Sequence, residues 1–286
     1  MVELKYIYMK TVRTFVLLLV FAYMHLPAEA QDTLYADAGG FKLQMVKIGS
    51  GDGPIIIMEN GMGGGVRWGR GIVDSLAHRA NVVTYARAFL GESGKGNTDR
   101  SGDVVANELK LALQDAGIQP PYIMVGHSLG GYYIKAFARA NPDDVKGLLL
   151  IDPLNTEDFY RDYEAEFPTL YKWEVENEGP KENDYEGIFV FGEVYGDDSV
   201  PTYIPAQLLI APEVPDYVLN KKPPFGSYKE DNINSQKLWV EHQLKWASNF
   251  PNVTAKVIEG ATHHVYHNRL DAVLEAFDEL IKTIKN

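Results

Sequence analysis

The sequence predicts an α/β domain with a mostly parallel sheet covered by helices on both faces. Short apolar runs typical of buried strands alternate with longer segments in which apolar residues recur at helical spacing. The chain has 286 residues, of which 45% are hydrophobic, and this is enough for a single sizeable core. It contains no cysteine, so disulfides and thiolate metal ligands are excluded.

Seven segments are expected to form strands, and helices are expected between them. The segment 41–49 alternates apolar and polar residues like an edge strand, and the other strands are mostly apolar runs. These other strands cover 54–59, 81–86, 122–126, 146–152, 206–211 and 254–260. The expected helices cover 68–79, 103–117, 130–140, 235–250 and 269–284.

The first thirty residues are expected to be a secretion signal. Basic residues precede the ten-residue apolar run 15–24, which is short for a bilayer span. Ala28 and Ala30 match the small-residue pattern that precedes a cleavage site. We therefore expect cleavage after Ala30, a folded domain over 31–286, no stable membrane anchor after cleavage, and a secreted or periplasmic protein. The alternative is an uncleaved anchor.

The charge of the chain excludes one class of partner and marks one segment. The formal net charge is −12 with no basic stripe, so nucleic acid is not an expected partner. From Glu157 to Asp198 there are 14 acidic and 3 basic residues, together with several aromatic residues that can pack. We expect the interruption at about 153–205 to be a lid insertion that shapes the site. The alternative is a solvated acidic excursion with a small core of its own.

A G-x-S-x-G motif, Gly126 to Gly130, lies between a predicted strand and a predicted helix. This context is typical of a sharp turn that exposes a nucleophilic serine at the end of a strand, with glycines where side chains would collide. Ser128 is therefore the predicted nucleophile. The backbone N–H of Leu129, at the start of the helix, is a predicted oxyanion donor.

A serine needs a base, and the base needs a carboxylate behind it. His263 follows the last predicted strand after a short turn and is the predicted base, with His264 as the alternative. Asp152, at the end of the strand next to the nucleophile strand, is the favoured acid. Asp216 or Glu213 in the loop after the following strand stays open as the alternative.

Two further features of the sequence concern ligands. The glycine-rich loop Asn60–Gly65 follows a buried strand, and we assign the second oxyanion donor to the N–H of Met62. The late histidines do not have the spacing of a metal site, so no metal is expected.

These segments together resemble the α/β-hydrolase superfamily, and more closely its esterase- and lipase-like serine hydrolases. The resemblance runs through "ENGMGGG", "YARAFLGESG", "GHSLGG", "LLIDP" and "GATHH". It implies an eight-stranded, mostly parallel sheet, a Ser-acid-His triad, no cofactor, and hydrolysis of a small-molecule ester or amide. Pancreatic-type lipases carry their acid after the strand where Asp152 lies, whereas most relatives use the next strand.

The chain departs from the family pattern at two places, which weakens inference about the substrate. Asn60-Gly61 stands where a His-Gly is frequent, and Ala86-Arg87 stands where an Asp-Arg is frequent. Two other functions stay open: an iminopeptidase-like peptidase, and a ligand-binding protein of the same fold without catalysis.

Overall fold

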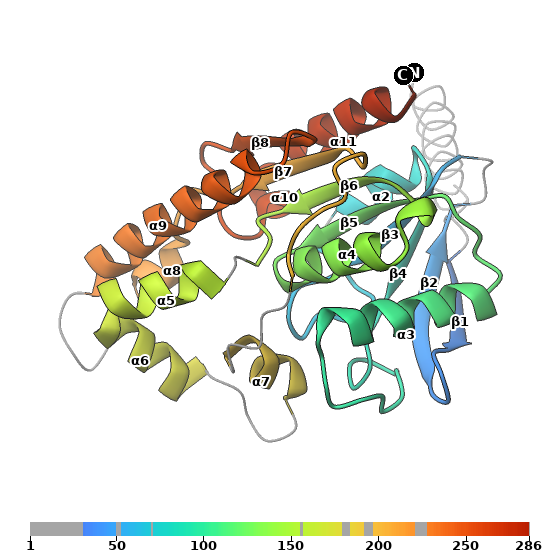
Figure 1. Ribbon diagram of the computed structural model, residues 1–286, viewed down its shortest axis with the longest axis horizontal. Coiled ribbons are helices and arrows are strands. Elements are labelled where there is room, and N and C mark those ends of the chain that lie inside the picture. Colours follow the sequence, from blue (N-terminus) through green and yellow to red (C-terminus); the bar gives the residue numbers. More distant parts are fainter. Residues whose placement is uncertain are drawn as a thin grey trace, which may run out of the picture. The chain divides into compact units, whose positions relative to one another are not determined.

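A single sheet of eight strands organises the computed structural model, in the order β1-β2-β4-β3-β5-β6-β7-β8 (Figure 1). The model describes residues 31–49, 53–69, 71–154, 157–178, 184–191, 197–220 and 228–285. The strands are β1 (Gln31–Asp37), β2 (Lys42–Ile48), β3 (Ile55–Glu59), β4 (Asn81–Tyr85), β5 (Tyr122–His127), β6 (Val145–Ile151), β7 (Ala206–Ile210) and β8 (Val253–Val257). β2 runs antiparallel to β4, and the pairs from β4 to β8 are parallel. The expected mostly parallel, eight-stranded sheet is confirmed.

The described helices lie between the strands and beyond them. They are α2 (Ile72–Ala77), α3 (Gly102–Asp115), α4 (Leu129–Ala140), α5 (Glu157–Glu166), α6 (Pro168–Glu178), α7 (Tyr185–Phe191), α8 (Asp216–Leu219), α9 (Tyr228–Ser248), α10 (Val265–Asn268) and α11 (Leu270–Lys285), with a 3-10 turn at Pro142–Asp144. The first expected helix, 68–79, is shorter in the structure. Gly71, with a φ of 83°, has a left-handed conformation that precedes the start of α2.

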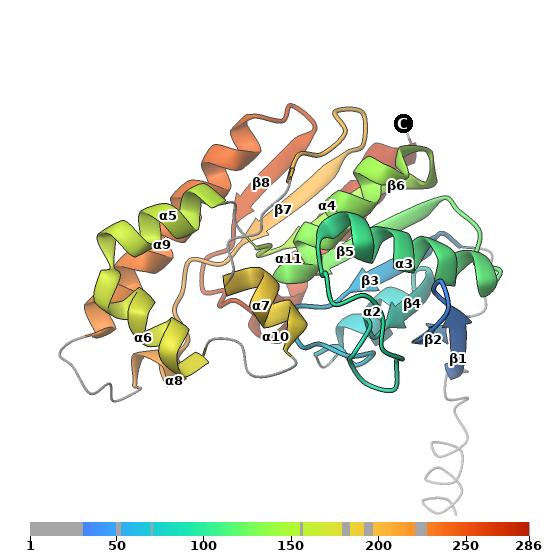
Figure 2. The same cartoon turned by 60° about the horizontal axis from the view of Figure 1, so that its bottom comes forward.

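Two layers of helices cover the sheet (Figure 2), and strands β3 to β7 contribute alternate residues to the core under each layer. Ile57 and Met124 point into the core under α3, α4 and α9, whereas Ile56 and Val125 point into the core under α2, α10 and α11. Because both faces of the central strands are buried, these strands appear in the sequence as continuous apolar runs.

The parallel register brings two of the predicted site residues to the same edge. His127 of β5 is paired with Ile151 of β6, so Ser128 and Asp152 each follow their strand at the same level. The Asp152 N–H donates to Leu209 O of the next strand at 2.7 Å. The carboxyl ends of the strands form the edge at which ligands bind in open α/β sheets.

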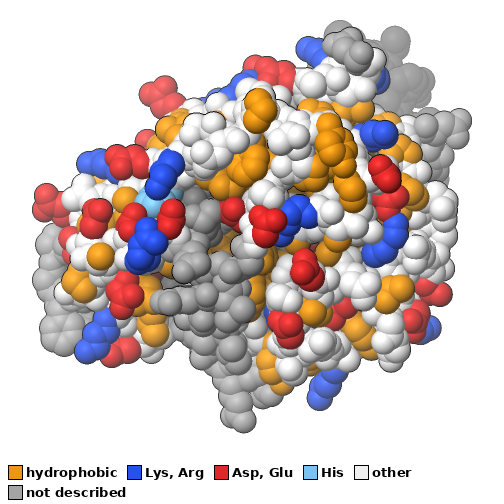
Figure 3. All heavy atoms as spheres, viewed as in Figure 1, with side chains coloured by type: hydrophobic (Ala, Val, Ile, Leu, Met, Phe, Trp, Pro, Cys, Tyr) orange, Lys and Arg blue, Asp and Glu red, His pale blue; other side chains and the backbone are white. Residues whose placement is uncertain are grey.

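The interruption at 153–205 leaves the sheet after β6 and returns before β7, and its described part is helical. Phe159, Tyr163 and Leu170 of α5 and α6 pack against Leu238 and Trp239 of α9. Acidic and basic side chains lie interspersed over this region at the left of Figure 3. The described part of the segment therefore packs against α9 through a small apolar cluster.

Some of the acidic side chains in this region have basic partners. Asp158 lies 2.9 Å from Arg161 and 3.8 Å from Lys245 of α9, and Asp162 lies 3.2 Å from His242. The two pairs of Asp158 offset part of the local negative charge.

The predicted signal at residues 1–30 lies outside the described residues. In the part of the chain that the structure describes, no helix combines the length and the apolar character needed to cross a bilayer.

Candidate active site

Ser128 forms a sharp turn between β5 and α4. Its φ of 53° and ψ of −124° are rare for a residue with a side chain and cost of order 1–3 kcal/mol. The turn is held by backbone hydrogen bonds, from Ser128 N to Ile151 O at 3.1 Å and from Leu154 N to Ser128 O at 2.8 Å. The surrounding backbone therefore keeps the serine in a strained, fixed position at the strand end, as the motif predicts.

The two glycines of the motif allow backbone segments to approach each other closely. A β-carbon at Gly130 would lie 2.0 Å from the carbonyl oxygen of Glu59, and one at Gly126 would lie 2.6 Å from Gly130 O. Both contacts are with backbone atoms, which cannot rotate away. Alanine at Gly130 would push α4 away from β3, and alanine at Gly126 would push α4 away from β5, so either change would displace the turn that carries Ser128.

Asp152 and His263 are brought together by the structure. Asp152 is fully buried at the end of β6, and its Oδ2 lies 2.7 Å from Nδ1 of His263. An ionised carboxylate only accepts hydrogen bonds, so Nδ1 carries the proton and Nε2 of His263 has a free lone pair. That is the tautomer a general base needs.

The alternative acids do not contact His263 among the described residues. Asp216 is the first residue of α8 and is exposed. Glu213 is also exposed, and the N–H of its backbone donates to Ala261 O at 3.0 Å. The geometry therefore favours Asp152 as the partner of His263.

The rings of His127 and His264 lie beside that of His263. The ring of His127 lies 4.7 Å from that of His263, and its Nε2 is 2.9 Å from the His263 carbonyl oxygen, to which it must donate. Burial, together with the neighbouring His263 and His264, holds the pKa of His127 well below its usual range. Burial and His263 likewise lower the pKa of His264 to about 4, and its ring stacks on His267 at 5.0 Å. His127 and His264 are thus neutral wall residues.

Trp239 holds the second carboxylate oxygen of Asp152, and the sequence gives no signal for this contact. Its indole Nε1–H donates to Asp152 Oδ1 at 2.9 Å, alongside the Ala211 N–H at 3.0 Å. From the same helix, α9, Gln236 Nε2 donates to Ala211 O at 2.7 Å. The contact depends on how α9 crosses the ends of β6 and β7, which no local pattern encodes.

Replacing Trp239 with phenylalanine is expected to lower kcat/KM of ester hydrolysis about tenfold. The ring stays but one hydrogen bond to a buried carboxylate is lost, at a cost of about 1.5–3 kcal/mol for a charged acceptor. Trp246→Phe is the matched control: Trp246 lies buried on the same helix, and its Nε1 has no partner among the described residues. Equal losses in both variants would show that the Trp239 N–H has no special role.

The loop Asn60–Gly65 is ordered by the side chain of its first residue. Asn60 Oδ1 accepts from the Gly61 N–H at 2.9 Å, and Asn60 Nδ2 donates to Gly65 O at 3.2 Å and to Arg67 O at 3.0 Å. A β-carbon at Gly64 would collide with this side chain at 2.5 Å. The Asn60 that departs from the family pattern is therefore the residue that closes the loop.

The two predicted oxyanion donors have free N–H groups. Neither the Met62 nor the Leu129 N–H donates to an acceptor within the described residues. Leu129 is the first residue of α4, where backbone N–H groups lack intrahelical acceptors. Both N–H groups are thus free to bind an oxyanion.

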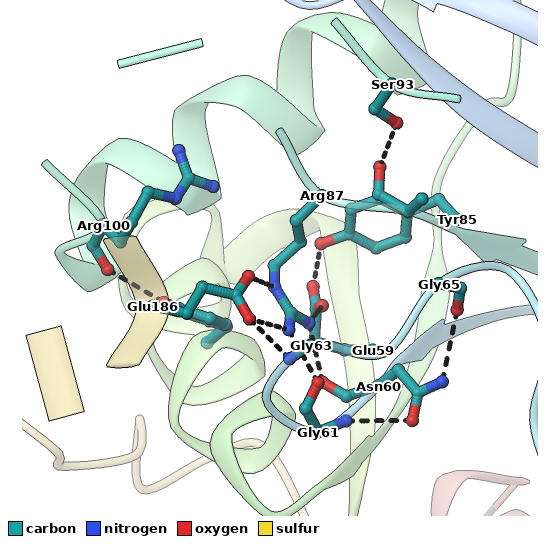
Figure 4. A network of polar contacts seen from close by, with 12 residues as sticks. Glu59, Asn60, Gly61, Gly63, Gly65, Tyr85, Arg87, Ser93, Arg100 and Glu186 are labelled. Atoms are coloured by element: carbon teal, nitrogen blue, oxygen red, sulfur yellow. Dashed lines mark hydrogen bonds and ion pairs between the residues drawn. The ribbon is translucent and has the colours of Figure 1, made fainter. Parts of the chain in front are cut away.

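A buried charged cluster lies behind the loop, and the sequence singles out only one of its members (Figure 4). Arg87, at the second place where the chain departs from the family pattern, lies 2.6 Å from Glu59 and 2.5 Å from Glu186. The hydroxyl of Tyr85 donates to the Glu59 carboxylate. Burial raises the pKa of Glu59 to about 7, against the opposing effect of Arg87. The one sequence signal for this cluster is that a charged residue, Glu59, ends an otherwise apolar strand.

The late histidines do not form a metal centre in the structure. Among the described residues, no three His, Asp or Glu side chains are grouped so that they could hold a metal ion. The described residues instead include a His–Asp pair, a strained serine turn and two backbone N–H groups without acceptors.

The comparisons with known proteins point to one fold. Residues 54–182 match the family model described as the alpha/beta hydrolase fold. An uncharacterised Bacillus subtilis protein, YqjL, is 31% identical over 123 residues, which cover 43% of this chain and 48% of that protein. The (lyso)-N-acylphosphatidylethanolamine lipase of Bos taurus is 32% identical over 102 residues, which cover 34% of this chain and 30% of the lipase.

The likeness to solved structures extends over nearly the whole chain. The crystal structure of a proline iminopeptidase-related protein from Thermus thermophilus aligns with a TM-score of 0.63 and 16% identity, covering 89% of this chain and 98% of that one. At this identity the likeness to the solved structure concerns the fold alone. The segments aligned with the curated sequence relatives span less than half of those proteins. By the family-model match over residues 54–182 and by its likeness to solved structures, the chain has the alpha/beta hydrolase fold.

Proposed function

We propose that the protein is a serine hydrolase that cleaves an ester, or an amide, of a small molecule through an acyl-enzyme intermediate on Ser128. The observation that carries this proposal is the 2.7 Å contact between His263 Nδ1 and the buried Asp152 carboxylate. This contact leaves Nε2 of His263 available to accept a proton, and Ser128 is held in a strained turn at the end of β5.

In the proposed reaction, His263 Nε2 takes the proton of the Ser128 hydroxyl while Oγ attacks the acyl carbonyl. The carbonyl oxygen becomes an oxyanion that accepts hydrogen bonds from the Met62 and Leu129 N–H groups. The imidazolium, stabilised by Asp152, then gives its proton to the leaving alcohol or amine. Water repeats the same steps on the acyl-enzyme and releases the acid.

The names of similar proteins support hydrolysis but not one substrate. The bovine relative is a lipase by name, and the Thermus structure is iminopeptidase-related by name. The acidic segment 157–198 favours a peptidase as the second candidate, because carboxylates could bind the free amino terminus of a peptide. Turnover of aminoacyl arylamides without turnover of esters would identify that alternative.

We also propose that residues 1–30 direct export and that the segment 153–205 acts as a lid. The basic front, short apolar run and Ala28-x-Ala30 pattern support the first. The position of the segment, between the carboxyl end of β6 and the start of β7, supports the second.

The proposal is tested by labelling the purified protein with a fluorophosphonate and by assaying short p-nitrophenyl esters. We expect the label on Ser128, identified by peptide mass, and neither label nor turnover in Ser128→Ala. A folded wild-type protein that neither labels nor cleaves any ester or arylamide would instead be a ligand-binding protein of this fold.

A further inference from the structure

Gly61 and Gly63, which flank Met62, form backbone hydrogen bonds with the two side chains of one buried ion pair (Figure 4). The Gly61 carbonyl oxygen accepts from Arg87 Nη2 at 2.7 Å, and the Gly63 N–H donates to Glu186 Oε2 at 2.9 Å. Arg87 and Glu186 bind each other through two contacts, Nε–Oε1 at 2.5 Å and Nη2–Oε2 at 2.8 Å. One pair of side chains therefore holds the loop before and after Met62.

These contacts set the direction of the Met62 N–H. The C=O and N–H of a trans peptide point in opposite directions, and the Gly61–Met62 peptide is trans. Since the Gly61 C=O points at Arg87, the Met62 N–H points away from it. The loop also passes beside Ser128, because a β-carbon at Gly61 would lie 3.3 Å from Ser128 Cβ. An oxyanion donor has to be a free N–H fixed close to the nucleophile.

The guanidinium of Arg87 suits this task because its donors form a rigid planar fork. Besides Glu186 and Gly61, it binds Glu59 Oε1 and Asn60 O, each at 2.6 Å. The Arg87 side chain is 1% exposed and that of Glu186 is 5% exposed. Burial acts to lower the pKa of Arg87, but the attraction and hydrogen bonds of Glu186 outweigh it and raise this pKa. The arginine thus stays charged.

We propose that Arg87 and Glu186 are positioning residues for the Met62 oxyanion donor. Glu186 belongs to α7, inside the segment 153–205, so this segment completes the oxyanion site in addition to covering it. A displacement of α7 would release the Gly63 N–H and one side of the Arg87 fork. This inference rests on the proposed serine hydrolase function and names the part of the chain on which the oxyanion site depends.

The test separates binding of the oxyanion from binding of the substrate. A trifluoromethyl ketone adds to an active serine, and the charged oxygen of the adduct occupies the oxyanion position. In the full chain, we expect Glu186→Gln to raise the inhibition constant of this ketone about tenfold or more and to lower kcat of ester hydrolysis similarly. Loss of a whole oxyanion donor costs about 10²–10³-fold. We expect KM to change much less, because the loop contacts serve the charged intermediate.

The matched control is Glu108→Gln, which weakens a second buried ion pair, Arg100–Glu108 at 2.9 Å, that makes no contact with the loop. We expect this variant to lower the thermal unfolding temperature but to keep the inhibition constant and kcat near wild type. The inference is overturned if folded Glu186→Gln has the wild-type inhibition constant, or if both variants change it equally.

If Glu186→Gln does not fold, Arg87→Lys carries the same measurement, because lysine keeps the charge but cannot reach Gly61 O and Glu186 together in the same plane. A raised inhibition constant in Arg87→Lys then supports the inference, and an unchanged one overturns it. A wild-type protein that binds no trifluoromethyl ketone and cleaves no ester contradicts the proposed function itself. The two failures are therefore distinguishable.

Discussion

Replacing Asp152 with asparagine is expected to lower kcat about 10⁴-fold with little loss of folding stability, as for the carboxylate of other triads. Oδ1 of Asp152 accepts from the Trp239 indole and the Ala211 N–H, so the oxygen of an asparagine must occupy that place. Its amide nitrogen then faces Nδ1 of His263 and donates to it. The imidazole proton moves to Nε2, and the base can no longer accept the serine proton.

Asp216→Asn is the control for this experiment, because Asp216 was the other candidate from the sequence and is exposed on α8. We expect it to retain wild-type kcat and KM. The measurement is steady-state kinetics on the best ester of a panel, with circular dichroism to verify folding. Full activity in Asp152→Asn combined with loss in Asp216→Asn would refute the assignment of the acid.

Substituting His263 by alanine is expected to lower kcat by about 10⁴- to 10⁶-fold, since the proposed base is removed. His264 cannot replace it, although it is adjacent. Its pKa of about 4, lowered by burial and then by His263, makes it a poor proton acceptor near neutral pH, and its ring stacks on His267.

His264→Ala is the corresponding control, and we expect it to keep most of the wild-type kcat, because the hydrogen bond to Asp152 is made by His263. Fluorophosphonate labelling rates provide an independent readout, because labelling needs the activated serine but not the natural substrate. If His263→Ala labels as fast as wild type, His263 is not the base.

The strand pattern of the fold could be predicted from the sequence more completely than the helices. The seven expected strands are all present in the structure. They could be predicted because burial on both faces, or on one, gives each strand a local apolar pattern. β1 was not expected, since "QDTLYAD" is short and polar and depends on pairing beside β2. α9 begins at Tyr228, whereas the sequence predicts a start at 235. Its first two turns carry few apolar residues, so they show no helical pattern of burial. In its next turns, Leu238 and Trp239 pack against α5 and α6.

The site could be predicted in part for the same reason. Ser128 and His263 are predicted from the motif and the strand order, which are local or topological, and their catalytic roles stay predictions. Asp152 and Asp216 remained open because each follows a strand end, and only side-chain direction separates them. Trp239 and Glu186 gave no signal at all, since each reaches the site from an element far away in the sequence.

The sequence by itself determined the α/β class, the strained serine turn with its glycines, and the edge of the sheet where the chemistry is placed. These depend on periodicity and on backbone space, which neighbouring residues encode. Only the tertiary structure decided which carboxylate meets His263 and which side chains hold the loop around Met62. Such choices depend on how α7 and α9 cross the strand ends, and these crossings are set by packing between segments that are distant along the chain.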